Sequence, residues 1–483
     1  MTLTQAVTKN TIIQTIGRFL SLLLGVLIVS LMMRYLGPEE YGYYSTSIAF
    51  LQTIGIIADF GLYLITLKYL GKADTQMRKS ASAERSEAYV MQNVFTLRFF
   101  SALFFYTLAF IISLFFPYPL IVKLGVLILS LAMFFNTLIQ TLSAFYQKKM
   151  RTEKIVFGEI IGRLVLLILI ILFVKLKFGF YWILATFIFG SGFNFLFLWL
   201  STKPWVVLKF KFDFNFWLEI LKQTWPIGLA ILLNAVYFKA DTLILSFYYP
   251  VIEVGIYGAC YRVFEVLVSL PPLFLGLVLP KISEVWTTNN LERLKNFLQK
   301  SFDFLVMVTL LMVFSTLVLG PKIMELIGGP EFIRSGEILR VIILATGILF
   351  VAELFKQTAI CLNQQKFILW FYLITTIFAL IGYFVFIPKY SYWGAAWMTV
   401  AAETLMFIFS LFVVWQKIKF FPNLIFFWKS FQAGLVVFFL LLFLQNWNLF
   451  ILIALATLVY FFSLYLLGGI DKTTIQAIFK LKS

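Results

Sequence analysis

The sequence contains no histidine and only two cysteines among 483 residues. Without an imidazole there is no histidine general base, no serine–histidine–aspartate triad and no histidine-ligated metal. Cys260 and Cys361 lie in apolar runs about 100 residues apart, a spacing that matches no metal or redox motif. We interpret both as small buried side chains, so the sequence predicts no metal site.

Charged residues are also scarce, at 13% of the chain, whereas soluble proteins carry about 25%. Hydrophobic residues make up 62%, and the mean hydropathy is +0.96. A soluble fold of this composition would expose a mostly apolar surface, so the composition predicts a membrane protein. The formal charge of +17 is explained by basic loops facing an anionic leaflet, and we expect no nucleic-acid partner.

Apolar runs of about 20 residues, the length that crosses a bilayer as a helix, recur about 14 times. They lie near residues 11–36, 42–70, 90–115, 120–145, 155–175, 179–201, 226–248, 253–280, 302–320, 338–363, 367–388, 391–415, 424–444 and 449–468. The first run is longer than the core of a signal peptide, roughly 7–15 residues, so we interpret it as a retained span. No connection is long enough for a soluble catalytic domain. The predicted fold is an all-α polytopic membrane protein that is not an enzyme.

Basic residues are divided unevenly between alternate loops, and this asymmetry predicts the orientation. One set of loops holds Lys72, Arg78, Lys79, Arg85, Lys148, Lys149, Arg151, Lys154, Lys203, Lys209, Lys211, Lys281, Arg293, Lys295, Lys300, Lys366, Lys417 and Lys419. The other set holds only Arg34, Lys123, Lys175, Lys177, Lys322, Arg334 and Lys389. We therefore expect both termini in the cytoplasm, which requires an even number of spans.

A weak internal repeat divides the chain, because three short motifs recur in the same order at offsets of about 211–217 residues. They are Glu40-Tyr41-Gly42 with Glu253-Val254-Gly255, Gln140-Thr141 with Gln357-Thr358, and Tyr181-Trp182 with Tyr392-Trp393. An offset of six spans gives both halves the same orientation, so an axis along the membrane normal should relate them. We predict a six-helix lobe at 1–210, a second at 211–420 and an extra helix pair at 421–483.

Ten charged residues fall inside the predicted spans, where each costs roughly 2.5–3.5 kcal/mol to insert and usually faces a cavity or a partner. They are Arg18, Asp59, Arg98, Lys239, Asp241, Arg262, Glu265, Glu353, Lys356 and Glu403. Arg262 with Glu265, and Glu353 with Lys356, are three residues apart and so share a helix face. For these pairs a structural and a functional role both stay open.

Lys239 and Asp241 are two residues apart and point to nearly opposite sides of the seventh span. Asn234 lies on the face of Asp241, so we interpret this polar helix as a cavity wall. Arg18 lies on the first span, about 10 Å along the helix from its start.

Asp59, on the second span, can reach Arg18 or Arg98 if the two side chains lie at the same depth. The alternative to a functional site is then an interhelical ion pair with a structural role. Pro271-Pro272 interrupts the eighth span, where a kink would either act as a hinge or only shape the helix.

The stretch Arg34-Tyr35-Leu36-Gly37-Pro38-Glu39-Glu40-Tyr41-Gly42-Tyr43-Tyr44, followed by Ala58-Asp59-Phe60-Gly61-Leu62, resembles the opening signature of the Wzx-type polysaccharide flippases. These proteins belong to the superfamily, abbreviated MOP, that also holds the lipid II flippases and the MATE drug exporters. Gly37-Pro38 favours a tight turn between the first two spans. The number of spans, the two six-helix halves and the terminal pair extend the resemblance over the whole chain.

The resemblance implies two lobes around a hydrophilic cavity that opens to each side of the cytoplasmic (inner) membrane in turn. The implied substrate is an oligosaccharide on polyprenyl pyrophosphate, used in polysaccharide biosynthesis for the cell envelope. We expect a monomer among membrane lipids, with no cofactor other than a coupling H⁺ or Na⁺. The candidate residues are Arg18, Arg98, Lys239, Arg262 and Asn234 for substrate; Asp59, Asp241, Glu265, Glu353 and Glu403 for coupling; and Pro271 and Pro272 for a hinge.

Two alternatives remain open, and a third is disfavoured by the short connections. A lipid II flippase differs only in its substrate. A MATE-like cation-coupled exporter is expected to have 12 helices and an acidic cavity. A membrane-embedded polymerase or glycosyltransferase would need a large loop or a soluble domain, which this sequence does not contain.

Overall fold

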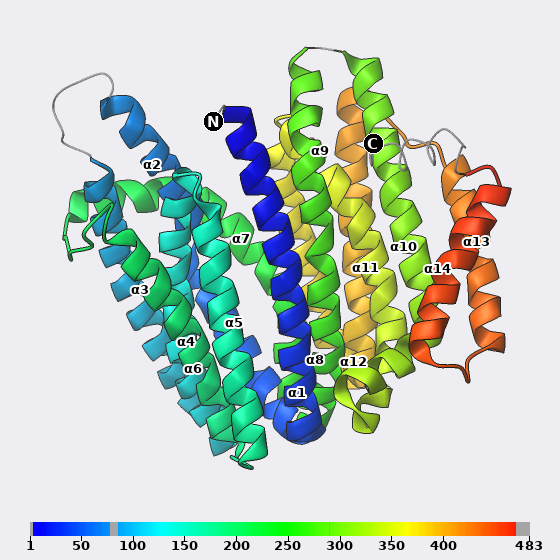
Figure 1. The fold of residues 1–483 in the computed structure, drawn as a ribbon, viewed down its shortest axis with the longest axis horizontal. Coiled ribbons are helices and arrows are strands. Elements are labelled where there is room, and N and C mark those ends of the chain that lie inside the picture. The colour runs from blue at the N-terminus through cyan, green and yellow to red at the C-terminus, as the bar shows by residue number, and fades with distance from the viewer. Residues whose placement is uncertain (1–2, 78–85, 289, 470–483) are drawn as a thin grey trace. The chain divides into compact units, whose positions relative to one another are not determined.

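The structure, a computed structural model, describes residues 3–77, 86–288 and 290–469, and these residues form helices and no strand (Figure 1). The helices are α1 (Leu3–Asp59), α2 (Leu62–Met77), α3 (Glu87–Phe115), α4 (Leu120–Lys148), α5 (Thr152–Lys175), α6 (Phe180–Thr202), α7 (Phe214–Tyr248), α8 (Val251–Val268), α9 (Leu270–Thr287), α10 (Leu291–Gly328), η1 (Pro330–Phe332), α11 (Ile333–Cys361), α12 (Gln365–Ile418), α13 (Ile425–Phe443) and α14 (Leu449–Leu466). The predicted all-α polytopic fold is confirmed.

Two helices are too long to be single spans. α1 has 57 residues and α12 has 54, so each would measure roughly 80–85 Å if it were straight, against about 30 Å of hydrocarbon. Each is broken by one residue of non-helical backbone, Gly37 with φ 65° in α1 and Ser391 with φ 54° in α12. The break at Gly37-Pro38 is the turn that the sequence predicts.

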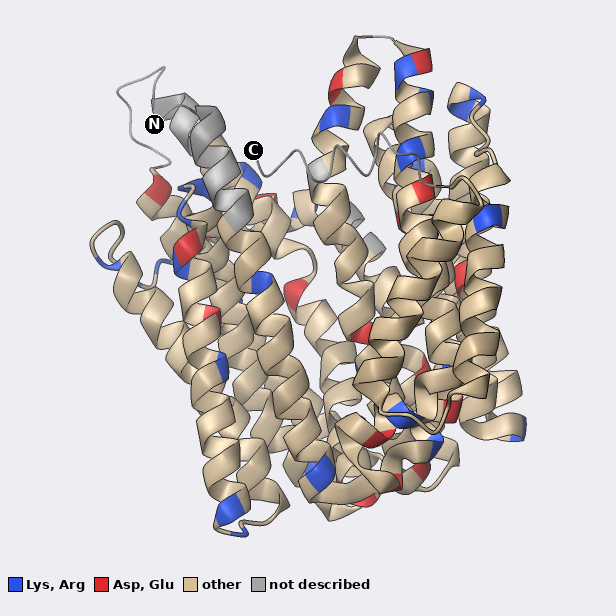
Figure 2. Cartoon of the chain, turned by 45° about the vertical axis from the view of Figure 1, so that its right-hand side comes forward, with Lys and Arg blue, Asp and Glu red and all other residues tan. Residues whose placement is uncertain are grey.

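Eleven helices in the described residues are long and apolar enough to cross a membrane, or twelve when the bent pair of segments 251–276 and 278–287 counts as one span. Because the breaks at Gly37 and Ser391 each divide one of these helices into two, the twelve correspond to fourteen crossings. Lys, Arg, Asp and Glu lie mainly towards the helix ends (Figure 2). The chain is therefore a multi-pass membrane protein.

The chain divides into two compact units, unit 1 at 1–255 and unit 2 at 256–483. Unit 1 contains α1 to α7, with α4 packed against α1, α3 and α6. α5 and α6 approach most closely at Gly162 and Gly190, where a Cβ on Gly162 would lie 2.6 Å from the carbonyl oxygen of Gly190. Small residues of this kind allow helix backbones to pack closely in membranes.

In unit 2, α11 packs between α10 and α12, and the hairpin α13–α14 packs on α10 (Figure 1). Buried Leu, Val and Ala residues fill the contact between α10 and the hairpin, and the Tyr460 hydroxyl donates a hydrogen bond to the Met307 carbonyl (3.0 Å). The predicted extra helix pair is thus anchored to α10.

Two copies of the repeated Glu-x-Gly motif pack together. A Cβ on Gly42 would lie 2.0 Å from the carbonyl oxygen of Val251, and a Cβ on Gly255 would lie 1.9 Å from that of Pro38. Only glycine fits at either position, because real Cβ contacts do not approach so closely. The repeat therefore marks a close backbone contact.

α7, which the repeat assigns to the second lobe, packs on α1, α2 and α3 and so groups with unit 1. The repeat compares sequence motifs, whereas the two units are defined by contacts between residues, so the two can assign α7 differently. The lobe boundaries at 210/211 and 420/421 stay a prediction.

Candidate functional site

The second membrane span is broken inside the apolar segment. α1 ends at Asp59 and α2 begins at Leu62, with φ 38° at Phe60 and 77° at Gly61. Gly61 adopts this backbone at no steric cost, whereas Phe60 is strained in it. The break leaves backbone groups at two helix ends within the span, where water is scarce and polar partners are needed.

Arg98 of α3 lies at this break and is 0% exposed. Its Nη2 donates to Asp59 Oδ1 at 2.5 Å and to Gln140 Oε1 of α4 at 2.8 Å. Its Nε and Nη1 have no hydrogen-bond partner among the described residues. The ion pair between Asp59 and Arg98, one of the alternatives from the sequence, is confirmed. Substrate binding by Arg98 stays a prediction.

Tyr63 of α2 extends this polar region. It donates a hydrogen bond to Gln147 of α4 and lies close enough to Arg18 and Asp59 to interact with both electrostatically. Arg18 itself is exposed on α1.

We call Arg18, Asp59, Tyr63, Arg98 and Gln140 the unit 1 polar cluster. Sequence reasoning found its three charges but missed Tyr63 and Gln140. Gln140 does belong to a repeated motif, and that was the available signal.

α7 carries the candidate residues Asn234, Lys239 and Asp241. Asp241 is fully buried, and its Oδ1 accepts hydrogen bonds from the backbone N–H (2.6 Å) and the hydroxyl (3.2 Å) of Thr242. Asn234 and Lys239 are half-buried. Their roles as a cavity wall stay a prediction.

Unit 2 contains a second buried polar cluster. Lys356 Nζ lies 2.7 Å from Glu353 Oε2, and the Gln357 amide donates to Glu353 Oε1 at 2.7 Å, all on α11. Lys356 also interacts electrostatically with Tyr372 and Glu403 of α12. We call these five residues the unit 2 polar cluster. The predicted pair Glu353–Lys356 is confirmed.

The two clusters differ in charge. In unit 1 Arg98 is matched by Asp59, and Arg18 adds a cation. In unit 2 Lys356 interacts with two carboxylates, Glu353 and Glu403. Glu403 is 0% exposed, so its carboxylate lies fully inside the protein.

Arg262 and Glu265 form the other predicted pair, with Arg262 Nη1 2.6 Å from Glu265 Oε2. Both side chains are partly exposed, at 36% and 27%. This pairing satisfies both charges within α8, and their roles in substrate binding and coupling stay predictions.

Pro271 and Pro272 lie in the first turn of α9, immediately after the helix is interrupted at Ser269. Proline is tolerated there, because these N–H groups have no helical partner. A bend of 41° lies between residues 251–276 and 278–287. Pro280 explains that position, since a proline ring clashes with the carbonyl four residues earlier, at Gly276.

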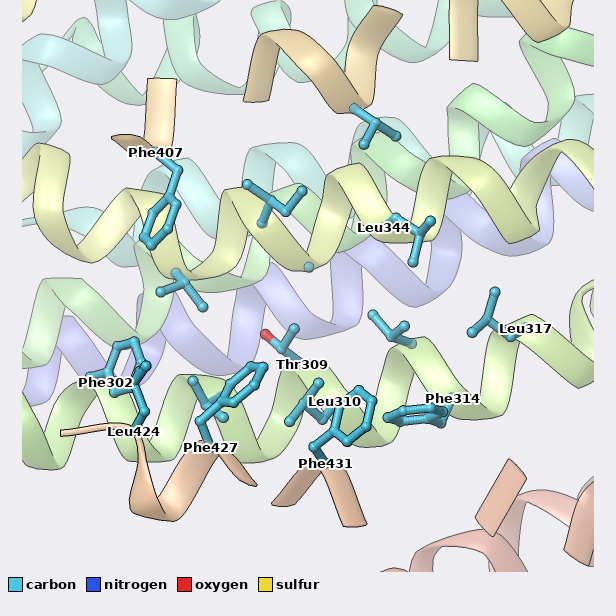
Figure 3. Close-up of a pocket in the computed structure, with 16 residues that line it drawn as sticks. Phe302, Thr309, Leu310, Phe314, Leu317, Leu344, Phe407, Leu424, Phe427 and Phe431 are labelled. Atoms are coloured by element: carbon cyan, nitrogen blue, oxygen red, sulfur yellow. The ribbon is translucent and has the colours of Figure 1, made fainter. Parts of the chain in front are cut away.

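A cavity of about 610 Å³ lies within unit 2, among α10, α11, α12 and α13 (Figure 3). Its lining is apolar apart from Thr309, whose hydroxyl is the one side-chain oxygen in it. The lining residues are Phe302, Val306, Thr309, Leu310, Val313, Phe314, Leu317, Leu344, Gly347, Ile348, Val351, Val400, Phe407, Leu424, Phe427 and Phe431. No sequence pattern predicted it.

The helical architecture defines the class of the protein, a multi-pass membrane protein with the fold of the MOP transporters. It resembles the lipid II flippase MurJ in an inward-closed conformation, with a TM-score of 0.76 and 16% identity over 94% of this chain and 97% of that one. It also resembles an inward-facing MATE multidrug transporter, with a TM-score of 0.67 and 13% identity over 83% of this chain and 95% of that one.

Residues 31–335 match the family described as polysaccharide biosynthesis proteins, and the chain belongs to that family. A Shigella dysenteriae protein assigned as an O-antigen transporter is 24% identical over 192 residues. That match covers 40% of this chain and 48% of the relative, about half its length. The predicted resemblance is confirmed.

Proposed function

We propose that the chain is a flippase, not an enzyme, which carries an oligosaccharide on polyprenyl pyrophosphate across the cytoplasmic membrane by alternating access. One joint observation carries this proposal. The chain belongs to a polysaccharide biosynthesis family and shares its fold, over 94% of its length, with a protein that flips a lipid-linked substrate.

The extent of the fold match favours a flippase over a MATE-like exporter. The MATE transporter is matched over 95% of its own length yet accounts for only 83% of this chain, whereas MurJ accounts for 94%. The difference is about fifty of the 483 residues. The fold of the lipid II flippase therefore matches more of this chain than the fold of the exporter does.

The chemistry of the substrate matches two features of the chain. A pyrophosphate needs cations, and Arg18 on α1 and Lys239 on α7 supply them within unit 1, where these helices pack together. A polyprenyl chain needs an apolar surface, which the cavity against α13 offers. Both assignments are part of the proposal.

The transport cycle needs an energy source, and we assign H⁺ or Na⁺ coupling to the unit 2 polar cluster. Glu403 of this cluster is 0% exposed, and a carboxylate buried within a span favours a bound proton or Na⁺. Asp59, by contrast, is paired with Arg98. Glu403→Gln should therefore abolish the response of transport to an imposed ion gradient, while Glu265→Gln keeps it.

The proposed location is the inner membrane, with both termini in the cytoplasm, and the proposed unit is a monomer surrounded by lipid. The basic loop residues support this orientation.

The test is a flip assay in proteoliposomes with a fluorescent polyprenyl-pyrophosphate oligosaccharide. The wild type should transport it, and Arg18→Ala and Lys239→Ala should each lose most of the rate. Lys366→Ala, an exposed lysine in unit 2, is the matched control and should transport normally.

Other outcomes separate the parts of the proposal. If both variants match the wild type, the flippase stands and the cation assignment is wrong. Transport of lipid II alone would point to a lipid II flippase, and ion-driven efflux of organic cations without glycan transport would point to an exporter.

A further inference from the structure

Four cations and an exposed tryptophan lie where α4 ends, α5 begins and α6 ends, at one end of unit 1. Lys149 and Arg151 lie in the turn between α4 and α5, Lys154 lies in the first turn of α5, and Lys203 and Trp205 follow α6. We call these five residues the α4–α5 turn site. None of them belongs to either polar cluster or to the cavity of unit 2.

Trp205 is 52% exposed. Lys149 Nζ lies 5.6 Å from the centre of its ring, and Arg151 Cζ lies 5.8 Å from it. Cations within about 6 Å of an indole face are attracted by the ring. Two cations are therefore held beside a side chain that still presents a large apolar surface.

Lys154 and Lys203 are held in the same manner. Lys154 Nζ lies 5.8 Å from the ring of Phe197, and Lys203 Nζ lies 4.4 Å from that of Trp199. Among the described residues, no carboxylate lies within ion-pair distance of either lysine. These two ammonium groups are thus available to an outside anion.

The surrounding backbone is fixed by hydrogen bonds. The Arg151 N–H donates to the Tyr146 carbonyl (2.9 Å), and the Trp205 N–H donates to the Thr202 carbonyl (2.9 Å). The hydroxyls of Tyr146 and Thr202 are themselves 2.9 Å apart, which ties the end of α4 to the end of α6. These hydrogen bonds hold the turn after α4 and the end of α6 next to each other.

The local charge is strongly positive. Glu87 pairs with Lys148 and Lys149, and Glu153 lies 3.6 Å from Arg151. With Lys148 included, five cations stand against these two carboxylates, an excess of three positive charges. An anion with no positive charge of its own complements this surface better than a zwitterion does.

The neighbouring segment presents exposed apolar side chains, which indicate the kind of anion. Val207, Phe210, Phe212 and Phe214 are 55–67% exposed. Because aromatic residues and long cations together mark the boundary between headgroups and acyl chains, this end of unit 1 suits a lipid rather than a free phosphate. We propose that the α4–α5 turn site binds the headgroup phosphate of an anionic phospholipid, with Lys154 and Lys203 on the phosphate and Trp205 against the glycerol region.

The test is native mass spectrometry of the purified full chain in detergent, with dioleoyl phosphatidylglycerol or dioleoyl phosphatidylcholine added separately. The wild type should retain phosphatidylglycerol in preference. The double variant Lys154→Gln/Lys203→Gln should weaken that binding about 10-fold or more, since each basic residue near the surface contributes to anionic-lipid binding. Lys154→Arg/Lys203→Arg should keep it.

Lys366→Gln/Lys417→Gln, two exposed lysines in unit 2, removes the same charge and should leave binding unchanged. Equal retention of both lipids by the wild type would overturn the proposal, as would equal losses in the two glutamine variants. Displacement of the lipid by soluble glycerophosphate at similar concentration would show a free-phosphate site instead. The assay requires no transport, so its result is independent of the proposed flippase activity.

Discussion

Single residues decide how the chain keeps charges within an apolar span. Arg98 is fully buried, and it is tolerated because Asp59 and Gln140 accept hydrogen bonds from its Nη2. Breaking a buried ion pair leaves an uncompensated charge, which costs far more than the pair contributes. The pair at the break of the second span is therefore expected to be sensitive to loss of either partner and less sensitive to loss of both.

Arg98→Met should destabilise the protein by about 3–5 kcal/mol, because it leaves Asp59 charged without its partner. Adding Asp59→Asn to this variant should recover part of the lost stability, because it removes the unpaired charge. Thermal unfolding of the four proteins in detergent gives a double-mutant cycle. If the loss in the double variant equals the sum of the two single losses, Asp59 and Arg98 are not coupled.

Glycine identity matters most where the repeated motif packs on itself. Gly42→Ala and Gly255→Ala would place a Cβ about 2 Å from a carbonyl oxygen, and overpacking of this kind typically costs about 1–3 kcal/mol. Both variants should unfold at lower temperature than the wild type. Gly71→Ala is the matched control, since no atom lies within 4 Å of its Cβ position, and it should unfold at or above the wild-type temperature.

At the scale of the helix, the breaks in long helices have separate physical causes. Gly37 takes a positive φ without cost, whereas Phe60 and Ser391 take one under strain. Prolines act according to position, so Pro271 and Pro272 begin α9 while Pro280 bends it.

Pro280→Ala should straighten the bend near Gly276, because it restores an N–H donor and removes the clash with the carbonyl four residues earlier. If the bend takes part in alternating access, the rate of flipping should fall several-fold without loss of thermal stability. Pro272→Ala, in the first turn of α9, should change neither quantity. A flip rate that falls for Pro272→Ala but not for Pro280→Ala would place the hinge at Pro271-Pro272, as the sequence predicts, and not at Pro280.

The sequence predicted features that depend on neighbouring residues. Runs of apolar residues indicated the spans, Gly37-Pro38 indicated a turn, and the three-residue spacing of Glu353 and Lys356 indicated their ion pair, all of which are confirmed. Most features that depend on packing between helices were missed, and the interhelical pair Asp59–Arg98 was only one of the alternatives that the sequence offered. In the sequence Phe60 is an ordinary apolar residue, and nothing indicates that the helix breaks there.

The same limit applies to partners far apart in the sequence. Nothing in the sequence near Gln140 indicates that its carbonyl faces Arg98, 42 residues away. The lining of the unit 2 cavity comes from four helices, none of which is unusual alone. Long-range contacts of this kind appear only when the helices are placed in space.

At the scale of the whole molecule, the hairpin α13–α14 does more than lengthen the chain. It packs on α10, and Leu424, Phe427 and Phe431 from its start close one side of the apolar cavity of unit 2 (Figure 3). If this cavity holds part of a polyprenyl chain, its volume should matter only for substrates whose chain is long enough to enter it.

Ile348→Trp should fill part of the cavity, because Ile348 lines it and a volume of about 610 Å³ leaves room for an indole. The flip rate should fall for a long polyprenyl-pyrophosphate glycan and stay near the wild-type value for the same glycan on a short prenyl chain. Ile374→Trp makes the same change on an exposed face of α12 and should affect neither substrate. Equal inhibition of the long-chain and short-chain substrates by Ile348→Trp would mean that the cavity does not hold the lipid. Filling the cavity should slow only a substrate whose chain is long enough to enter it.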